Sequence, residues 1–262
     1  MRIRLDLAYD GAGFHGFAVQ PDGLPTVGGV LRDALIRLGG DGDTLVVAGR
    51  TDKGVHALGQ VAHVDAAADS RLVRDPQAAR AALDGMCGPP ITIWRVRRVP
   101  ASFHARFSAV QRRYRYRLCD APALDPLARG HTWHVGGPPL DIPAMRAGGG
   151  HLLGEHDFDA FCRRGGQTHL RRRVDELTLR RRPHGMLEVT VAGPAFCQQM
   201  VRSIVAALVA VGRRRRTPAW IAEALAERDR AAIGAIAPPH GLVLTAVRYP
   251  SGRQVEAEAF PA

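Results

Sequence analysis

The residue best suited to chemistry is Asp52, which lies between two cations, Arg50 and Lys53. Two glycines bracket this turn, and the short apolar run 45–47 before it predicts a buried strand. Because neighbouring positive charges favour the ionised form of a carboxyl group, we expect Asp52 to be negatively charged. A carboxylate on a glycine-hinged turn at the end of a strand suits a nucleophile or a general base. An ordinary solvated turn has the same composition, so the turn alone does not separate the two interpretations.

A second charged residue, Arg202, is notable for its apolar surroundings. The run 198–211 predicts a helix that is apolar on nearly every side, which is typical of a buried helix. An unpaired buried guanidinium costs on the order of several kcal/mol, and a cation near a helix N-terminus is disfavoured by the helix dipole. We therefore expect a carboxylate partner for Arg202 from elsewhere in the chain. A structural ion pair with any Asp or Glu, or an arginine that reaches water at the end of the helix, stays open at this point.

Aromatic and basic residues alternate in the run 110–119, which predicts a strand. On such a strand Tyr114 and Tyr116 share one face, and the opposite face carries three arginines: Arg113, Arg115 and Arg117. This pattern fits a core face opposite a solvated face. It fits equally well a strand on which one tyrosine stacks on an extruded nucleobase. The spacing does not distinguish the two tyrosines.

Composition narrows the class of protein. Among 262 residues, Lys and Arg number 36 and Asp and Glu 25, and the net charge of +11 indicates a polyanionic partner. Nucleic acid is the first expectation and an anionic membrane surface the second. The four cysteines are scattered without a Cys-x-x-Cys pair, which predicts reduced, mostly buried thiols in a cytoplasmic protein. The chain opens on a predicted strand rather than a signal peptide, and its most apolar stretch, 204–211, is too short to cross a bilayer.

Motifs for other chemistries are absent or incomplete. The sequence lacks the zinc, deaminase and Walker-type phosphate motifs, so we expect no metal and no cofactor. Residues 11–16 do read G-x-G-x-x-G after a predicted strand, which offers a nucleotide-dependent oxidoreductase as one alternative. A dinucleotide site also needs a helix that begins at this turn. Pro21 and Pro25 delay the helix until about Thr26, which disfavours that alternative.

Strands and helices follow a similar order in two halves of the chain. In the first half, strands are predicted over 3–9, 45–47, 60–65 and 91–99, and helices over 26–38 and 77–83. In the second half, strands are predicted over 110–119, 174–181, 187–191 and 242–249, and helices over 143–153, 198–211 and 217–227. We therefore predict an α+β fold of two similar α/β-sandwich halves around a central cleft, divided as 1–108 and 109–262.

Several strings of sequence occur in one order over nearly the whole chain. They are Tyr9-Asp10-Gly11 with Phe14-His15-Gly16, Ala48-Gly49-Arg50-Thr51-Asp52-Lys53-Gly54-Val55-His56-Ala57, Phe103-His104-Ala105-Arg106-Phe107-Ser108, Arg112-Arg113-Tyr114-Arg115-Tyr116, Phe196 with Met200-Val201-Arg202, and Gly241-Leu242. Together these strings resemble the signature of the bacterial tRNA pseudouridine synthase A family, which modifies the anticodon stem–loop. The match of the whole set is far more specific than any single motif.

The resemblance implies a fold, an activity and a set of roles. The fold is the pseudouridine synthase fold with mostly antiparallel sheets, and the activity is isomerisation of uridine to pseudouridine at tRNA positions 38, 39 and 40. The family pairs as homodimers and uses no cofactor. The resemblance makes Asp52, Tyr114 and Arg202 the catalytic residues. Asp52 is the catalytic carboxylate, Tyr114 the active-site tyrosine that stacks on the base, and Arg202 the partner of Asp52. With the basic residues expected to contact RNA, the predicted substrate-binding set is Tyr114, Arg50, Arg106, Arg163 and Arg164.

Three places depart from the family pattern. Phe17-Ala18 replaces Trp-Gln, Lys53 stands where Ala is usual, and the segment 85–89 replaces one that contains Asn. We expect these changes to affect fine substrate contacts rather than the central chemistry. A catalytically silent RNA-binding protein on the same fold is the remaining alternative, and the intact set of Asp52, Tyr114 and Arg202 disfavours it.

Overall fold

The chain folds into two compact units. The computed structural model describes residues 1–21, 23–163 and 170–250. The first unit contains Met1–Arg112 and the C-terminal stretch from Leu244, and the second contains Arg113–Val243. Most of the final strand therefore belongs to the first unit, although it follows the second unit in sequence. The division predicted from sequence order, 1–108 and 109–262, does not include this return of the chain, and as a division into domains it stays a prediction.

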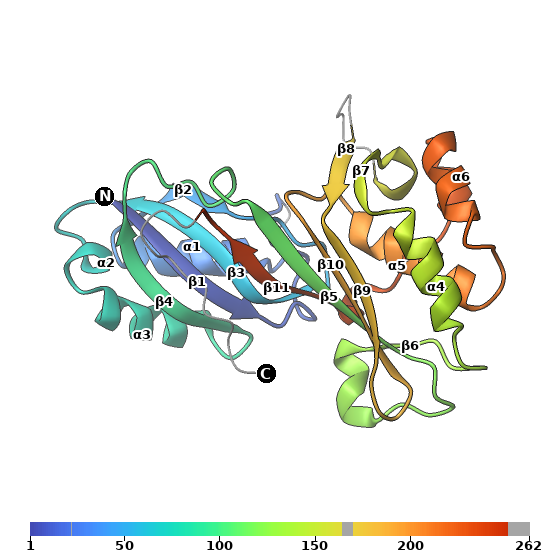
Figure 1. Cartoon of the computed structure of the whole chain (residues 1–262). Coiled ribbons are helices and arrows are strands. Elements are labelled where there is room, and N and C mark those ends of the chain that lie inside the picture. Colours follow the sequence, from blue (N-terminus) through green and yellow to red (C-terminus); the bar gives the residue numbers. More distant parts are fainter. Residues whose placement is uncertain (22, 164–169, 251–262) are drawn as a thin grey trace. The chain divides into compact units, whose positions relative to one another are not determined.

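The first unit is a sheet backed by helices (Figure 1). Its strand order is β4-β1-β3-β11, with β2 paired to β3, and β1 runs antiparallel to both of its neighbours. The strands are β1 (Arg2–Tyr9), β2 (Gly40–Val47), β3 (His56–Ala66), β4 (Ile91–Val99) and β11 (Leu242–Arg248). The helices are α1 (Val27–Arg37), α2 (Arg71–Arg74) and α3 (Pro76–Cys87).

Local sequence signals determine where the helices of this unit begin. Thr26 caps α1, because its hydroxyl accepts a hydrogen bond of 3.1 Å from the backbone N–H of Gly29. Asp75 caps α3 in the same way through Ala78, and a proline occupies the first turn of that helix. Both predicted helix starts are confirmed. Strand β2 begins earlier than the predicted run 45–47, because the polar stretch from Gly40 also pairs with β3.

Both faces of β1 are buried, whereas its alternation predicts a single apolar face. Residues Ile3, Leu5 and Leu7 are fully buried on the expected face. On the other face Arg4 is only 1% exposed, and its guanidinium forms an ion pair of 2.6 Å with Asp6. The guanidinium carbon of Arg4 also lies 5.5 Å from the ring centre of Phe103 and 4.7 Å from that of Tyr249. Arginine is thus accommodated in the core by one carboxylate and two aromatic rings.

The second unit combines a sheet, a small two-stranded sheet and several helices (Figure 1). The sheet has the order β5-β10-β9, formed by β5 (Gln111–Cys119), β9 (Glu176–Arg181) and β10 (Met186–Gly193), and β6 (Trp133–His134) pairs with β5. Strands β7 (Gly154–Asp157) and β8 (Arg171–Val174) pair antiparallel. The helices are α4 (Ile142–Gly150), α5 (Met200–Gly212), α6 (Trp220–Glu227) and α7 (Arg230–Ile233). The short 3-10 turns are η1 (Pro126–His131), η2 (Asp159–Phe161) and η3 (Pro239–Gly241). The predicted hairpin is confirmed as β9 and β10.

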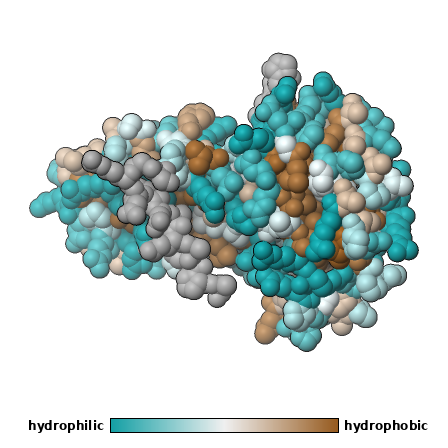
Figure 2. Space-filling model, viewed as in Figure 1, coloured by the Kyte–Doolittle hydropathy of each residue, from teal (hydrophilic) through white to brown (hydrophobic). Residues whose placement is uncertain are grey.

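Helix α5 is the buried helix of the second unit, as its all-round apolar sequence predicts. Figure 2 shows that the visible surface of the molecule is, by contrast, dominated by hydrophilic residues. No helix within residues 1–21, 23–163 and 170–250 is long and apolar enough to span a membrane.

The four cysteines do not all behave as the sequence predicts. Cys87 and Cys119 are free and buried, as expected. Cys162 and Cys197 instead form a disulfide, so the expectation of four reduced thiols is wrong for this pair. The two residues are 35 positions apart in sequence, and only the fold brings their Cα atoms to 5.7 Å.

The connection between β4 and β5 is attached to the first sheet by His63. The ring of His63, only 2% exposed, accepts a hydrogen bond of 3.0 Å at Nδ1 from the backbone N–H of Ala105. Burial, with the nearby positive charge of Arg2, lowers the pKa of His63 to about 4. A proton on Nδ1 would remove this acceptor, so the attachment requires the neutral ring.

We predict that this histidine makes the protein less stable in mild acid. An unfolded histidine takes up a proton near pH 6.5, whereas His63 in the fold stays neutral to about pH 4. The contribution of neutral His63 to the free energy of unfolding is therefore present above pH 6.5. It is lost as the pH falls toward 4, and its magnitude is about 2–3 kcal/mol. His63→Gln keeps an acceptor but does not titrate. Urea unfolding at pH 7 and pH 4.5 should show a larger loss for the wild type than for this variant, and equal losses would contradict the assignment.

Candidate active site

The turn that carries Asp52 joins β2 to β3 and is closed by its own backbone. The N–H of Val55 donates to the carbonyl of Asp52 at 3.1 Å, and Gly54 adopts a positive φ of 76°. A positive φ suits glycine because it has no Cβ. Asp52 is half-buried, while Arg50 and Lys53 on either side are exposed. The Nζ atom of Lys53 lies 3.1 Å from Nε2 of His15, so the departure from the family pattern makes a contact of its own.

A buried hydrogen-bond network holds this turn to the sheet. The hydroxyl of Thr51 lies 2.8 Å from the hydroxyl of Tyr9 on β1. The side-chain amide of Gln60 donates to that same tyrosine hydroxyl at 3.1 Å and to the carbonyl of Gly49 at 2.8 Å. Burial raises the pKa of Tyr9 to about 12, so it stays neutral and acts through hydrogen bonds alone. The residues on both sides of Arg50 are therefore fixed from the core.

The glycine-rich segment 11–16 packs its backbone against the Asp52 turn. A Cβ atom at Gly11 would lie 2.1 Å from the carbonyl oxygen of Val55, and one at Gly16 would lie 3.0 Å from that of Thr51. Gly16 also has a φ of 96°. Helix α1 begins only at Val27, so the segment does not provide the helix N-terminus that a dinucleotide site requires. Its glycines allow the close approach of two loops.

The buried guanidinium of Arg112 joins the Asp52 turn to the loop that carries Arg106. Its Nη2 donates to the carbonyls of Ala48, at 2.8 Å, and of Arg106, and its Nη1 donates to Ala109 at 3.0 Å. Arg112 is 7% exposed. The structure thus brings the backbones of two predicted site segments, at Ala48 and at Arg106, to one side chain.

Arg112 was not among the predicted site residues, although the sequence carries a signal for it. On β5 the alternation that turns Tyr114 and Tyr116 inward also turns Arg112 inward, and all three are buried. An arginine on the apolar face of a strand needs acceptors, here the three carbonyls. In the sequence, Arg112 directly precedes Arg113, the first of the three arginines on the opposite face of the strand.

In the second unit, Tyr114 packs edge-on against an aromatic residue of the loop before α5. The ring centres of Tyr114 and Phe196 are 5.3 Å apart, with an angle of 90° between the planes. Tyr114 is 8% exposed. Tyr116 is fully buried, and its hydroxyl donates to the carbonyl of Pro238 at 2.8 Å. The structure therefore uses Tyr116 in packing.

Arg202 lies in the first turn of α5 and is 9% exposed. Its Nε donates to the carbonyl of Ala237 at 2.7 Å, and the backbone N–H of Ala237 donates to the carbonyl of Arg202 at 3.2 Å. The two contacts join the start of α5 to the segment at Ala237, and the bond from Nε orients the guanidinium. The expected carboxylate partner, Asp52, belongs to the other unit, so their ion pair stays a prediction.

The start of α5 also holds Arg163. The backbone N–H of Arg163 donates to the carbonyl of Gln198 at 3.0 Å, and the disulfide between Cys162 and Cys197 ties the same two segments together. Arg163 is exposed beside this junction. The other member of the predicted pair, Arg164, lies outside the described residues.

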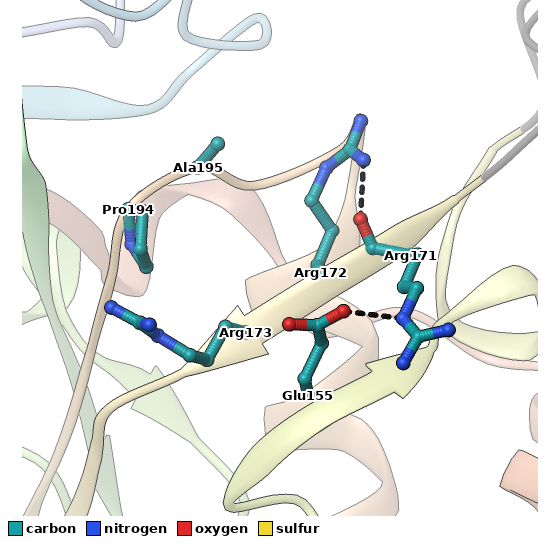
Figure 3. Close-up of a pocket in the computed structure, with 6 residues that line it drawn as sticks. All are labelled: Glu155, Arg171, Arg172, Arg173, Pro194 and Ala195. Atoms are coloured by element: carbon teal, nitrogen blue, oxygen red, sulfur yellow. Dashed lines mark hydrogen bonds and ion pairs between the residues drawn. The ribbon is translucent and has the colours of Figure 1, made fainter.

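A basic pocket of about 350 Å³ lies on the small sheet of the second unit (Figure 3). Its lining comprises Glu155, Arg171, Arg172, Arg173, Pro194 and Ala195. Arg171 forms an ion pair with Glu155, and Arg173 forms one of 2.7 Å with Asp175. Figure 3 shows the segment at Pro194 and Ala195 opposite the arginines of β8. Three arginines face a single lining carboxylate, so the pocket favours an anion.

Comparison with known proteins identifies the family. A sequence model of the tRNA pseudouridine synthase family matches residues 150–250. The tRNA pseudouridine synthase A of Frankia casuarinae is 46% identical over 99% of this chain and 93% of its own length. The proteins of the same name from Streptomyces avermitilis and Cereibacter sphaeroides are 43% and 44% identical, over 96% and 95% of this chain and 89% and 98% of their own lengths. The chain belongs to the tRNA pseudouridine synthase family.

A solved structure, the archaeal box H/ACA sRNP Nop10-Cbf5 complex, aligns with 79% of this chain and 43% of the other. The identity is 12% and the TM-score 0.34, a likeness too slight to support any conclusion. The family assignment confirms the predicted resemblance and, with it, the pseudouridine synthase fold and the isomerase class.

We predict that the two glycines of one loop respond differently to the same substitution. Gly11→Ala would place a methyl group against the backbone of Val55, so the loop or the Asp52 turn must move. Gly13→Ala meets nothing within 4 Å and serves as the matched control. Misplacement of a reacting group by about 1 Å costs on the order of 100-fold in rate, so Gly11→Ala should lower kcat/KM about 100-fold, while Gly13→Ala should stay within about twofold. Similar activities of the two variants would refute the packing role of Gly11.

Proposed function

We propose that this chain isomerises uridine to pseudouridine in the anticodon stem–loop of tRNA, at positions 38, 39 and 40, with Asp52 as the catalytic carboxylate. The observation that carries the proposal is the anchoring of the Asp52 turn. A half-buried carboxylate lies on a turn whose backbone is fixed on either side, at Gly49 and at Thr51, by side chains from the core. Membership of the tRNA pseudouridine synthase family supplies the reaction to which such a carboxylate belongs.

The isomerisation is balanced without a co-reactant. The C1′–N1 bond of the uridine breaks, the uracil rotates in place, and a C1′–C5 bond forms. The proton on C5 is lost and one is gained at N1, so no electron carrier is required. A carboxylate can attack the ribose C1′, add to the uracil C6, or assist elimination at the sugar. Each of these routes requires Asp52 to be ionised and correctly oriented.

Tyr114 is assigned to the base. Its edge-on contact with Phe196 fixes the orientation of the tyrosine ring, and a fixed aromatic face can stack on an extruded uracil. Its hydroxyl is the candidate acceptor for the C5 proton.

Arg202 is assigned to holding Asp52. The contact from Nε to Ala237 orients the guanidinium, and an oriented guanidinium can meet a carboxylate with two parallel hydrogen bonds. The burial of Arg202 strengthens such a pair, because the local dielectric constant is low. In this role Arg202 is a positioning residue rather than a catalytic one.

The exposed arginines are assigned to the RNA backbone. Arg50 and Arg106 in the first unit and Arg163 in the second are exposed, and the basic pocket of Figure 3 adds Arg171, Arg172 and Arg173. Arg164 shares the assignment by its place in the sequence. Phosphate contacts of this kind make the affinity depend on salt concentration. We further propose that the protein acts in the cytoplasm as a homodimer, without metal or cofactor, and sedimentation of the purified chain tests the dimer.

We predict that Asp52→Asn binds tRNA but does not turn it over. The amide is close in size to the carboxylate, yet it is a poor nucleophile and a poor base. Release of tritium from tRNA labelled at uridine C5 should fall by on the order of 10³-fold or more, while tRNA affinity stays within a few-fold. Asp43→Asn, at an exposed carboxylate in the same unit, is the control and should keep wild-type release. Multiple turnover by Asp52→Asn would overturn the assignment. Full tRNA binding without release by the wild type would instead indicate a silent RNA-binding protein.

We predict that the positive charge of Arg202 and the planar shape of its guanidinium make separable contributions to stability and turnover. Arg202→Leu removes both, along with the hydrogen bond to Ala237, and should lower the free energy of unfolding by about 1.5–3 kcal/mol and abolish turnover. Arg202→Lys retains a cation but has no planar fork for two parallel hydrogen bonds. Arg202→Lys should therefore be more stable than Arg202→Leu and should still lose most of the turnover. Thermal melting and tritium release measure the two effects, and full activity in Arg202→Lys would exclude a role based on the planar guanidinium.

A further inference from the structure

Phe107 is presented to solvent in the connection between β4 and β5. It is 75% exposed, whereas Trp94, another exposed aromatic residue of the same unit, is 37% exposed. Single exposed apolar residues are common and need no explanation by themselves. Phe107 differs because its loop is rigidly built and because a cation and a second ring accompany it.

The loop holds Phe107 outward by hydrogen bonds at nearly every backbone position. Nδ1 of His104 accepts from the N–H groups of Arg106, at 3.2 Å, and of Phe107, at 3.1 Å. The N–H of Ser108 donates to the carbonyl of His104 at 2.9 Å, and the hydroxyl of Ser108 accepts from the N–H of His104 at 3.0 Å. This side of the loop is thus a closed turn centred on His104.

The other side of the same loop is attached to the core. Ala105 donates its N–H to His63 at 3.0 Å and accepts a hydrogen bond of 2.7 Å from the hydroxyl of Tyr249 at its carbonyl. A loop anchored on both sides loses little conformational freedom when it binds a ligand. The exposure of Phe107 is therefore a property of a fixed surface rather than of a loose segment.

Three side chains form what we call the Phe107 cluster: His104, Arg106 and Phe107. The ring centres of His104 and Phe107 are 4.4 Å apart and tilted by 31°, close to an offset stack. The guanidinium carbon of Arg106 lies 5.4 Å from the centre of the Phe107 ring. An exposed ring with an adjoining guanidinium is the combination that binds unpaired nucleotides, because the ring stacks on a base and the cation meets a phosphate.

Arg112 joins the backbone of the Phe107 cluster to Ala48, at the start of the segment that leads to Asp52. The same guanidinium of Arg112 donates to the carbonyl of Ala48 at 2.8 Å and to that of Arg106. We propose that Phe107 is a stacking subsite for an unpaired nucleobase of the RNA beside the target uridine, with Arg106 on the adjoining phosphate. This inference rests on the proposed function, since it takes tRNA as the ligand. It adds a contact that fixes the register of the anticodon loop.

The test measures tRNA affinity in an Asp52→Asn background, in which turnover does not interfere. Stacking of one base contributes on the order of 5- to 150-fold in affinity, so Phe107→Ala should raise Kd within this range. Phe107→Trp should restore binding, because indole also stacks, and Phe107→Leu should not. Ile36→Ala, at a residue 51% exposed on α1, is the matched control for loss of an exposed apolar side chain and should keep the affinity. In the otherwise native chain, the loss in Phe107→Ala should be expressed mainly as a higher KM.

Three outcomes would overturn the proposal. Wild-type affinity in Phe107→Ala would exclude a contact with RNA. Full rescue by Phe107→Leu would indicate an apolar contact rather than stacking on a base. A large drop in melting temperature for Phe107→Ala would show that the ring supports the fold. The proposed function fails separately, if the unmodified chain binds tRNA but releases no tritium from labelled uridine, and in that case the affinities still decide whether Phe107 stacks.

Discussion

The architecture of the first unit depends on the close approach of two loops, the glycine segment 11–16 and the turn that carries Asp52. Gly11 and Gly16 lie so near the carbonyls of Val55 and Thr51 that no side chain could replace their hydrogen atoms without movement of the backbone. A hydrogen bond between the hydroxyl groups of Tyr9 and Thr51 also holds this turn. These interactions are between backbones and buried hydroxyls, so they fix the backbone that carries the Asp52 carboxylate.

Buried arginines also hold segments of this unit in place, and they do so through different contacts. Arg4 is neutralised by Asp6 and covered by the rings of Phe103 and Tyr249, so it belongs to the core. Arg112 donates to three backbone carbonyls and joins two loops. A guanidinium suits this task because its donors are fixed in one plane and its charge persists when buried. A lysine could not hold three carbonyls in fixed directions, since its single nitrogen has a flexible stem.

Local chemistry made much of the fold predictable from sequence. The caps at Thr26 and Asp75 and the hairpin turn before β10 follow from interactions within a few residues. What could not be predicted depends on contacts between distant segments. The disulfide joins residues far apart in sequence, and the inward position of Arg4 depends on rings from Phe103 and Tyr249. In the candidate site, the resemblance chose Tyr114 over Tyr116, and the burial and hydrogen bond of Tyr116 agree with a packing role for the latter. The role of Arg112 was accessible from its place on the inward face of β5, but only if a cation is allowed there.

Strand β5 also connects the two sets of proposed site residues along the chain. The boundary between the units falls after Arg112, which anchors the loops of Asp52 and Arg106, and Tyr114 follows two positions later on the same face of the strand. Side chains at positions i and i+2 of a strand point the same way and are separated by about 7 Å along it. A single strand therefore supplies the anchor of one unit and the aromatic residue of the other. Insertion of one residue between them would place the side chains of Arg112 and Tyr114 on opposite faces of the strand.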